Sequence, residues 1–329
     1  QKGGCEGAGA RLNLSHFHVT NVGKRGIPLR SIKLLIEETC AALAAEPARS
    51  APSESRISAP GATVIVQFAE HVDDAVSRDL IDWIDHVADQ VSMPYGRFPL
   101  AASRVVIIPT KGKPWGGDSP VPFGRVTRRG GETIELYVDV DRPIADMYAD
   151  WTATHEFSHL FLPKISWRQK WISEGFASYY QNVLMARAGQ YTQAQAIRKL
   201  SEGFDRGRGS RPELSPNQAA EEGVRYARYK IYWSGAAIAL LADLQLRSRS
   251  GGKESLDTVL GSFQQCCLPS KKYWSGVQFF TRLDSLIDEP VFMPLYREHA
   301  NTAGFPDMNA ALSDPLLREQ IFRVRTSPN

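Results

Sequence analysis

The sequence predicts an α+β fold in which a small mixed sheet with helices is followed by a helical subdomain. Over residues 63–108, apolar residues recur first with strand spacing, then with helical spacing and then with strand spacing again. From residue 143 onward, nearly all periodic segments have the spacing of helices. We therefore expect one domain over 61–329, with a sheet part at about 61–142 and a helical part at about 143–329.

The composition is that of an ordinary globular protein and argues against several classes of partner. Hydrophobic residues make up 43% of the 329 residues, and charged residues make up 23%. The net charge of +3 is too small to indicate a nucleic-acid partner or a membrane surface. The sequence has no run of about eighteen apolar residues, so we expect no integral membrane segment. Nothing in the composition indicates the oligomeric state.

Residues 1–60 are predicted to be an N-terminal extension and linker, because residues 46–60 are rich in Ala, Pro, Ser and Arg. The first residue is Gln rather than Met, which is compatible with removal of a signal peptide or with a trimmed chain. We expect an exported protein, periplasmic or extracellular. The four cysteines are not spaced like a zinc or redox pair, and a bridge between the neighbours Cys266 and Cys267 would be strained.

The sheet part contains clear strand and helix periodicities. Strands are expected at 63–68 and 104–108, and an amphipathic helix is expected between them at 72–91. A further strand is expected at 132–140. We place it beside a cleft between the sheet part and the helical part.

The residues that precede this last strand are expected to be irregular. Residues 110–124 are rich in Gly, Pro and Lys, which is typical of a loop. The short basic patch of Arg125, Arg128 and Arg129 is interpreted as a solvated turn.

The helical part begins with an H-E-x-x-H motif made by His155, Glu156 and His159. Apolar residues recur at helical spacing over 144–162, with one proline before this stretch and another after it. We therefore expect a single helix over 144–162. Residues i and i+4 lie on one face of a helix, so the two imidazoles can bind one Zn²⁺. The glutamate between them can then act on water at the metal.

A catalytic zinc site usually has three protein ligands and one open position, so the motif requires a third ligand. Residues 163–170 form a short connection, and a second helix is expected over 171–188, ending at Gly189. Glu174 lies in the first turn of this helix and is the candidate ligand if the two helices are antiparallel. The alternative is a first-turn glutamate that the helix dipole favours.

Together, the motif and residues 171–180 resemble the catalytic core of gluzincin zinc metallopeptidases. The run W-I-S-E-G-F-A-S-Y-Y is similar to W-L-N-E-G-F-A-x-Y of aminopeptidase-N-like enzymes, and closer to S-E-G-F-T-S-Y-Y of glycyl-aminopeptidase-like enzymes. The resemblance implies a thermolysin-like zinc-peptidase fold, with Zn²⁺ on His155, His159 and Glu174 and with Glu156 as general base. The interval between His159 and Glu174 is shorter than these families usually have, so the connection must be tighter.

The resemblance also implies a role for Tyr232. The run Y-x-x-G-A that begins at Tyr232 is similar to Y-x-K-G-A in both groups, where the tyrosine hydroxyl stabilises the tetrahedral oxyanion. The alternative is a tyrosine packed in a helical core. Tyr226 and Tyr229 lie on overlapping faces of the same helix and are competing candidates.

A substrate-binding residue is suggested by a third, weaker likeness. In aminopeptidase-N-like enzymes, a G-x-M-E-N motif on an edge strand supplies a glutamate that binds the free amino group of the substrate. Here Gly130, Gly131 and Glu132 stand at a comparable distance before His155, although Met and Asn are absent. Glu132 is therefore a candidate for substrate binding, and an exposed glutamate after a turn is the alternative.

The resemblance thus implies a zinc-dependent peptidase that acts on peptide or protein substrates, and specifically an aminopeptidase. Three alternatives stay open: an endopeptidase of the same fold, an esterase or amidase, and an inactive zinc-stabilised binding protein. The presence of Glu156 argues against the last alternative, because a purely structural metal site needs no base.

Overall fold

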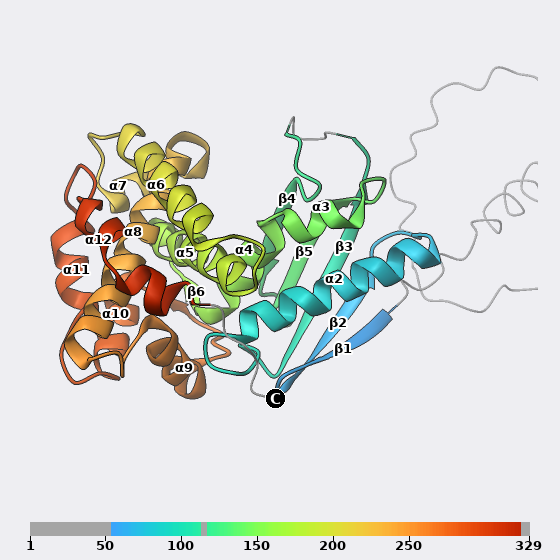
Figure 1. The fold of residues 1–329 in the computed structure, drawn as a ribbon, viewed down its shortest axis with the longest axis horizontal. Coiled ribbons are helices and arrows are strands. Elements are labelled where there is room, and N and C mark those ends of the chain that lie inside the picture. Colours follow the sequence, from blue (N-terminus) through green and yellow to red (C-terminus); the bar gives the residue numbers. More distant parts are fainter. Residues whose placement is uncertain (1–53, 113–116, 324–329) are drawn as a thin grey trace, which may run out of the picture. The chain divides into compact units, whose positions relative to one another are not determined.

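The computed structural model describes residues 54–112 and 117–323, all of which belong to one structural unit (Figure 1). Most of the predicted extension, residues 1–53, lies outside the described residues. None of the described helices has the length and apolar character needed to cross a membrane.

A five-stranded mixed sheet forms the first part of this unit, as the sequence predicts. Its spatial order is β1-β2-β3-β5-β4, with parallel pairing in the centre and an antiparallel strand at each edge. The strands are β1 (Glu54–Ala59), β2 (Ala62–Phe68), β3 (Ala102–Thr110), β4 (Phe123–Thr127) and β5 (Thr133–Asp139). The predicted strands at 63–68 and 104–108 correspond to β2 and β3.

The linker prediction is wrong for residues 54–59, which form the edge strand β1. This strand pairs with β2 through a tight turn at Pro60 and Gly61, where Gly61 has a φ of +73°. Residues on β1 alternate between exposed and half-buried positions. Because an edge strand with one exposed face can be almost entirely polar, its composition resembles that of a linker.

The position expected for the strand at 132–140 is also wrong. This segment does form β5, but β5 is internal, between β3 and β4. The edge strand next to β5 is β4, which lies in residues that the sequence predicted to be a loop and a solvated turn. β4 contains Gly124 and Arg125 and lacks the alternation of a half-buried strand, so its pattern gave no strand signal.

One long helix covers a face of the sheet. Helix α2 (Asp74–Ser92) agrees with the predicted helix at 72–91 and begins at Asp73, whose carboxylate accepts a hydrogen bond from the Ala75 amide. It lies across the sheet and reaches α4 and α5 of the helical part (Figure 1).

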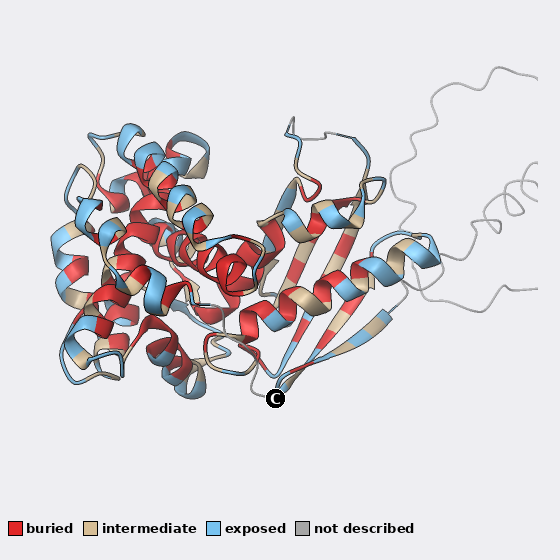
Figure 2. Ribbon diagram, in the orientation of Figure 1, coloured by how far each residue is buried: buried red, intermediate tan, exposed pale blue. Residues whose placement is uncertain are grey.

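The helical part is built around two buried helices, α5 (Lys170–Arg187) and α8 (Val224–Ser250), which pack against each other (Figure 2). The sequence predicts α5 as the helix over 171–188, and it places Tyr226, Tyr229 and Tyr232 on one helix, which is α8. The surrounding helices are α3 (Ile144–Ala149), α4 (Thr152–Ser158), α6 (Gln193–Gly209), α7 (Pro216–Glu222), α9 (Leu256–Cys267), α10 (Gly276–Asp284), α11 (Phe292–His299) and α12 (Asn309–Ser313). Two-residue strands β6 (Lys164–Ile165) and β7 (Tyr273–Trp274) pair in parallel.

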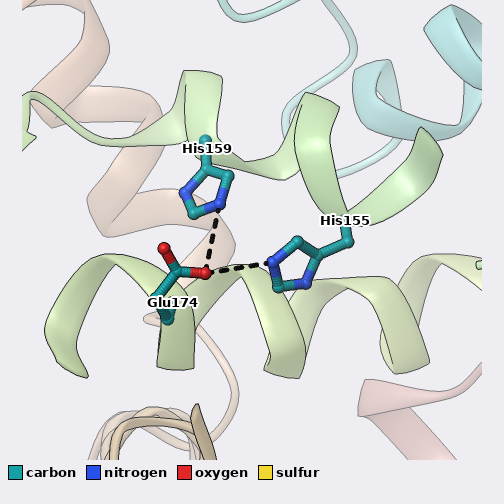
Figure 3. Close-up of side chains that lie close together, drawn as sticks. All are labelled: His155, His159 and Glu174. Atoms are coloured by element: carbon teal, nitrogen blue, oxygen red, sulfur yellow. Dashed lines mark hydrogen bonds and ion pairs between the residues drawn. The ribbon is translucent and has the colours of Figure 1, made fainter. Parts of the chain in front are cut away.

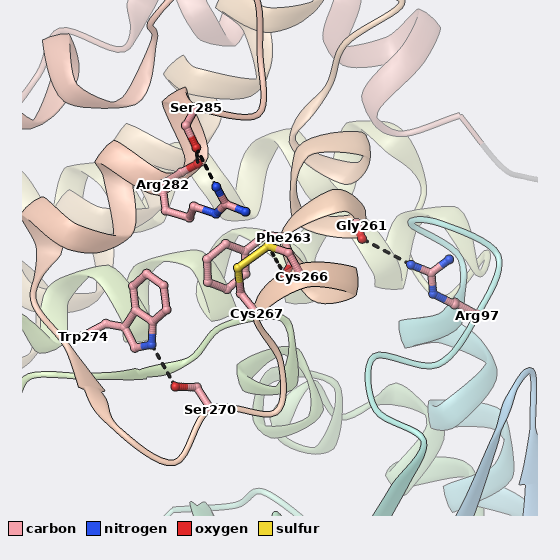
Figure 4. The surroundings of a disulfide bond; sticks show 9 residues. All are labelled: Arg97, Gly261, Phe263, Cys266, Cys267, Ser270, Trp274, Arg282 and Ser285. Atoms are coloured by element: carbon pink, nitrogen blue, oxygen red, sulfur yellow. Dashed lines mark hydrogen bonds between the residues drawn. A yellow bond between two sulfur atoms is a disulfide. The ribbon is translucent and has the colours of Figure 1, made fainter.

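A disulfide joins Cys266 and Cys267 at the carboxyl end of α9 (Figure 4). The structure thus contains the bridge between neighbouring cysteines that the sequence made unexpected.

Candidate metal centre and active site

The H-E-x-x-H motif lies on a shorter helix than the sequence predicts. The segment 144–162 contains α3, a break at Asp150, α4 and a 3₁₀ turn at His159–Phe161. At the break, Asp150 has an extended backbone and its carboxylate accepts a hydrogen bond from the Thr152 amide at 2.7 Å. This local bond begins a new helix, which the apolar periodicity cannot reveal because it continues across the break.

The structure brings His155, His159 and Glu174 together, with their side chains pointing toward one another (Figure 3). Glu174 Oε2 lies 3.4 Å from His155 Nε2 and 3.6 Å from His159 Nε2. Donors around a tetrahedral Zn²⁺ at about 2.0–2.1 Å are about 3.3–3.4 Å apart. All three side chains are buried, so their chemistry and their spacing fit this ion.

Both imidazoles are held by a hydrogen bond at the ring nitrogen that faces away from the group. His155 Nδ1 lies 2.8 Å from Gln181 Oε1, and His159 Nδ1 lies 2.9 Å from Ser173 Oγ. An amide oxygen can only accept, so His155 carries its proton on Nδ1 and leaves Nε2 free for a metal. Gln181 was missed in the sequence, although it follows Glu174 by seven residues and thus lies on the same helix face.

Glu174 is held as an anion by the groups around it. Burial alone would raise its pKa, but His159, His155 and Lys170 hold that pKa well below the ordinary value. Lys170 Nζ lies 3.1 Å from Glu174 Oε1. Burial lowers the pKa of His159 to about 3, so this ring is neutral and able to bind a cation.

Glu156 lies at the wall of the same centre. Burial, reinforced by the Glu174 charge, raises the pKa of Glu156 to about 7, which is suited to accepting and returning a proton. Strand β4 lies in close contact with Glu156. A Cβ at Gly124 of this strand would lie only 2.5 Å from Glu156 Cγ. Gly124 is therefore what allows the edge strand to approach this side chain so closely.

Tyr232 stacks on His155, with ring centroids 5.7 Å apart and an angle of 8° between the planes. Burial and the neighbouring Glu174 carboxylate raise the pKa of Tyr232 well above its ordinary value, so its hydroxyl remains a donor. The two competitors point elsewhere, since Tyr226 is 65% exposed and Tyr229 is 48% exposed. Of the three tyrosines, Tyr232 is the one that lines the cavity over the metal ligands.

Two glycines determine the position of Tyr232. A Cβ at Gly235 would lie 1.9 Å from the carbonyl oxygen of Trp171, and a Cβ at Gly175 would lie 2.2 Å from Gly235 Cα. Helices α5 and α8 can therefore touch only because both residues lack side chains. This contact explains the glycines in the S-E-G-F and Y-x-x-G-A runs, and it brings Tyr232 next to Glu174.

A cavity of about 700 Å³ opens over the metal ligands and runs along the edge strand. It is lined by every residue of β4 and by Arg128, Glu156, His159 and Glu174, among others. A second cavity of about 360 Å³ lies on the other side of Tyr232 and is lined by three cations, Lys199, Arg206 and Arg228.

The structure does not bring Glu132 to this cavity. Glu132 lies before β5, and its backbone carbonyl accepts a hydrogen bond from the Arg104 amide of β3 at 3.0 Å. The charge of its carboxylate raises the pKa of Arg128. This effect opposes burial, which lowers the pKa of that guanidinium. Glu132 was expected beside the cleft as part of an edge strand, but the edge strand there is β4 and β5 is internal.

Part of the chain that contributes to this centre matches a known peptidase family. The family described as M61 glycyl aminopeptidase matches residues 163–236, a segment that contains Glu174 and Tyr232 but not the H-E-x-x-H motif. No curated protein matches the chain.

Solved structures give a likeness over a larger part of the chain. An aminopeptidase N family protein from Idiomarina loihiensis has a TM-score of 0.58 and 14% identity, over 79% of this chain and 48% of its own. An M1 zinc metallopeptidase from Deinococcus radiodurans, bound to a Tyr-Ser-Ala substrate, has a TM-score of 0.51 and 13% identity, over 80% of this chain and 54% of its own. The chain thus spans about half the length of these relatives. The gluzincin resemblance and the α+β fold inferred from the sequence are confirmed, and the chain has the fold of M1 zinc-peptidase domains.

Proposed function

We propose that the protein is a zinc-dependent peptidase, and specifically an aminopeptidase. One observation carries this proposal: the buried group of His155, His159 and Glu174 lies beside a cavity that His159 and Glu174 line together with the base Glu156 and the donor Tyr232. The M61 match and the M1 zinc-peptidase fold support the same activity.

Zinc is the metal that we propose for this centre, because two imidazoles and one carboxylate form a typical catalytic zinc ligand set. A bound Zn²⁺ supplies Lewis acidity, which acidifies water and polarises a carbonyl group. Gln181 and Ser173 fix the two rings so that both Nε2 atoms face Glu174.

Side chains of this chain carry out proton transfer and stabilise the oxyanion, and one of its strands binds the peptide. Glu156 takes a proton from the attacking water and returns it to the leaving amine, for which a pKa of about 7 is suitable. Tyr232 stays protonated and donates to the oxygen on which negative charge develops. The free edge of β4 lines the cavity, so an extended peptide can add to it as a further strand.

An endopeptidase is the second candidate, and the residues of the cavity favour it in one respect. Among the described residues, the only carboxylates that line the cavity are Glu156 and Glu174, and Glu132 is not among them. An aminopeptidase usually needs a further carboxylate to bind the substrate ammonium group.

The test compares hydrolysis of one peptide with hydrolysis of its N-acetylated form. An aminopeptidase cleaves the free peptide and leaves the acetylated one intact. Equal cleavage of both forms would replace the aminopeptidase with the endopeptidase. Stable zinc binding without cleavage of either form would leave the inactive binding protein.

A further inference from the structure

Arg128 is a half-buried cation at the wall of the cavity over His159 and Glu174, directly after β4. Burial lowers the pKa of its guanidinium, and the charge of Glu132 opposes this effect. One nitrogen, Nη2, donates to the backbone carbonyl of the metal ligand His159 at 2.8 Å. This bond fixes the guanidinium beside the centre and leaves most of its five N–H donors for other partners.

Among the described residues, no carboxylate forms an ion pair with Arg128. Glu132 acts on the pKa of Arg128 through its charge, but the two side chains do not form an ion pair. Partial burial removes some of the water around this guanidinium, and no paired anion compensates for that loss. The proposed hydrolysis makes no use of Arg128, so the mechanism does not explain its presence.

The other charges of the cavity make it favourable for an anion. Five cations line it, and two of these are paired: Arg125 with Glu135 at 2.6 Å, and Lys170 with Glu174 at 3.1 Å. The remaining three, Arg128, Arg129 and Lys164, have no ion-pair partner among the described residues. The negative charges in the lining of the cavity come from two carboxylates, Glu156 and Glu174.

We propose that Arg128 binds a carboxylate of the peptide substrate and makes the enzyme selective for anionic peptides. This inference rests on the proposed peptidase function and names its substrate class. A guanidinium held at one edge can present two parallel N–H groups to a carboxylate, which is the geometry of the strongest ion pairs. The carboxylate is either an acidic side chain near the scissile bond or the free C-terminus of a short peptide.

The experiment uses matched peptides with the zinc-loaded full chain. One set pairs Asp with Asn, one or two positions from the scissile bond on either side. The other set pairs a free C-terminus with its amide. We expect the carboxylate member of at least one set to have a kcat/KM about tenfold or more above its twin, and the set that responds identifies the source of the carboxylate. A ratio near one in every pair would overturn the proposal.

Two variants assign the preference to Arg128. Arg128→Gln should bring the ratio close to one, and Arg128→Lys should keep part of it, because lysine retains the charge without the planar fork. Arg198→Gln is the matched control, because Arg198 is an exposed arginine paired with Glu202 away from the cavity, and it should keep the full ratio. An unchanged ratio in Arg128→Gln would assign the preference elsewhere and refute the role of Arg128.

A binding measurement separates this inference from the proposed function. Calorimetry with the same peptide pairs on the Glu156→Gln variant measures affinity without turnover. If wild-type enzyme cleaves the neutral twins but neither assay shows a preference, the inference fails and the peptidase stands. If no peptide is cleaved but carboxylate peptides bind more tightly in an Arg128-dependent way, the peptidase fails and the anion site stands. Zinc content and thermal melting are measured for each Arg128 variant. They show whether the substitution changes the preference only because the hydrogen bond to the His159 carbonyl is lost and the metal centre is disturbed.

Discussion

Replacing Gly235 by alanine tests whether the contact between α5 and α8 positions Tyr232, the proposed oxyanion donor. The new Cβ would lie 1.9 Å from the carbonyl oxygen of Trp171, whereas an ordinary contact begins at 3.4 Å. The obstacle is backbone, so no side-chain rotation can relieve it. The two helices must therefore separate by about 1.5 Å, a forced overpacking that costs about 1–3 kcal/mol.

Two measurable losses follow from this separation. A destabilisation of that size lowers the melting temperature by about 3–10 °C in a domain of this length. Tyr232 lies three residues before Gly235, so its hydroxyl moves with α8, and a displacement of about 1 Å costs about 10²-fold in kcat. Thermal melting and steady-state kinetics on the best peptide measure both losses.

Gly209→Ala is the control, because Gly209 is an exposed helical glycine whose Cβ would meet nothing within 4 Å. Alanine favours a helix more than glycine does, so this variant should melt at the same temperature or slightly higher, with unchanged kcat. Wild-type melting and wild-type kcat in Gly235→Ala would refute the explanation of the two glycines. An equal loss in Gly209→Ala would show that the effect is not specific to the contact between α5 and α8.

Three further substitutions test individual side chains of the centre. Glu156→Gln should keep zinc and the fold but lose nearly all turnover, since an amide cannot accept the proton; wild-type turnover contradicts the assigned base. Tyr232→Phe should lower kcat about 10²–10³-fold with little change in KM, and Tyr229→Phe should not; the reverse pattern would assign the role to Tyr229. Gln181→Leu should weaken zinc affinity about 10–100-fold in a chelator competition; unaltered affinity would show that His155 needs no such partner.

The parts of the fold that the sequence predicts are those with strong local signals. The H-E-x-x-H motif, Glu174 and the Y-x-x-G-A run each combine particular residue types with a fixed spacing, and the structure brings these residues together. Helix α2 has a clear apolar period, α5 is followed closely by Gly189, and the ends of both helices lie near where the sequence indicates.

The missed features depend on contacts that sequence spacing does not reveal. Strand β4 is short, charged and glycine-containing, so only its pairing with β5 defines it as a strand. The break before α4 arises from one side-chain hydrogen bond of Asp150. The expected position of the strand after Glu132 was wrong because of β4, since an edge strand without a sequence signal made the next strand look like the edge. Arg128 was interpreted as part of a solvated turn for the same reason.

Zinc stoichiometry tests the account most directly. The purified chain should hold about one Zn²⁺ by elemental analysis, and the His155→Ala, His159→Ala double variant should hold none while keeping its melting cooperative. Chelation should abolish peptide hydrolysis, and added zinc should restore it. Full metal retention in the double variant, or undiminished hydrolysis by the chelated protein, would contradict the assignment of His155, His159 and Glu174 as the catalytic metal centre.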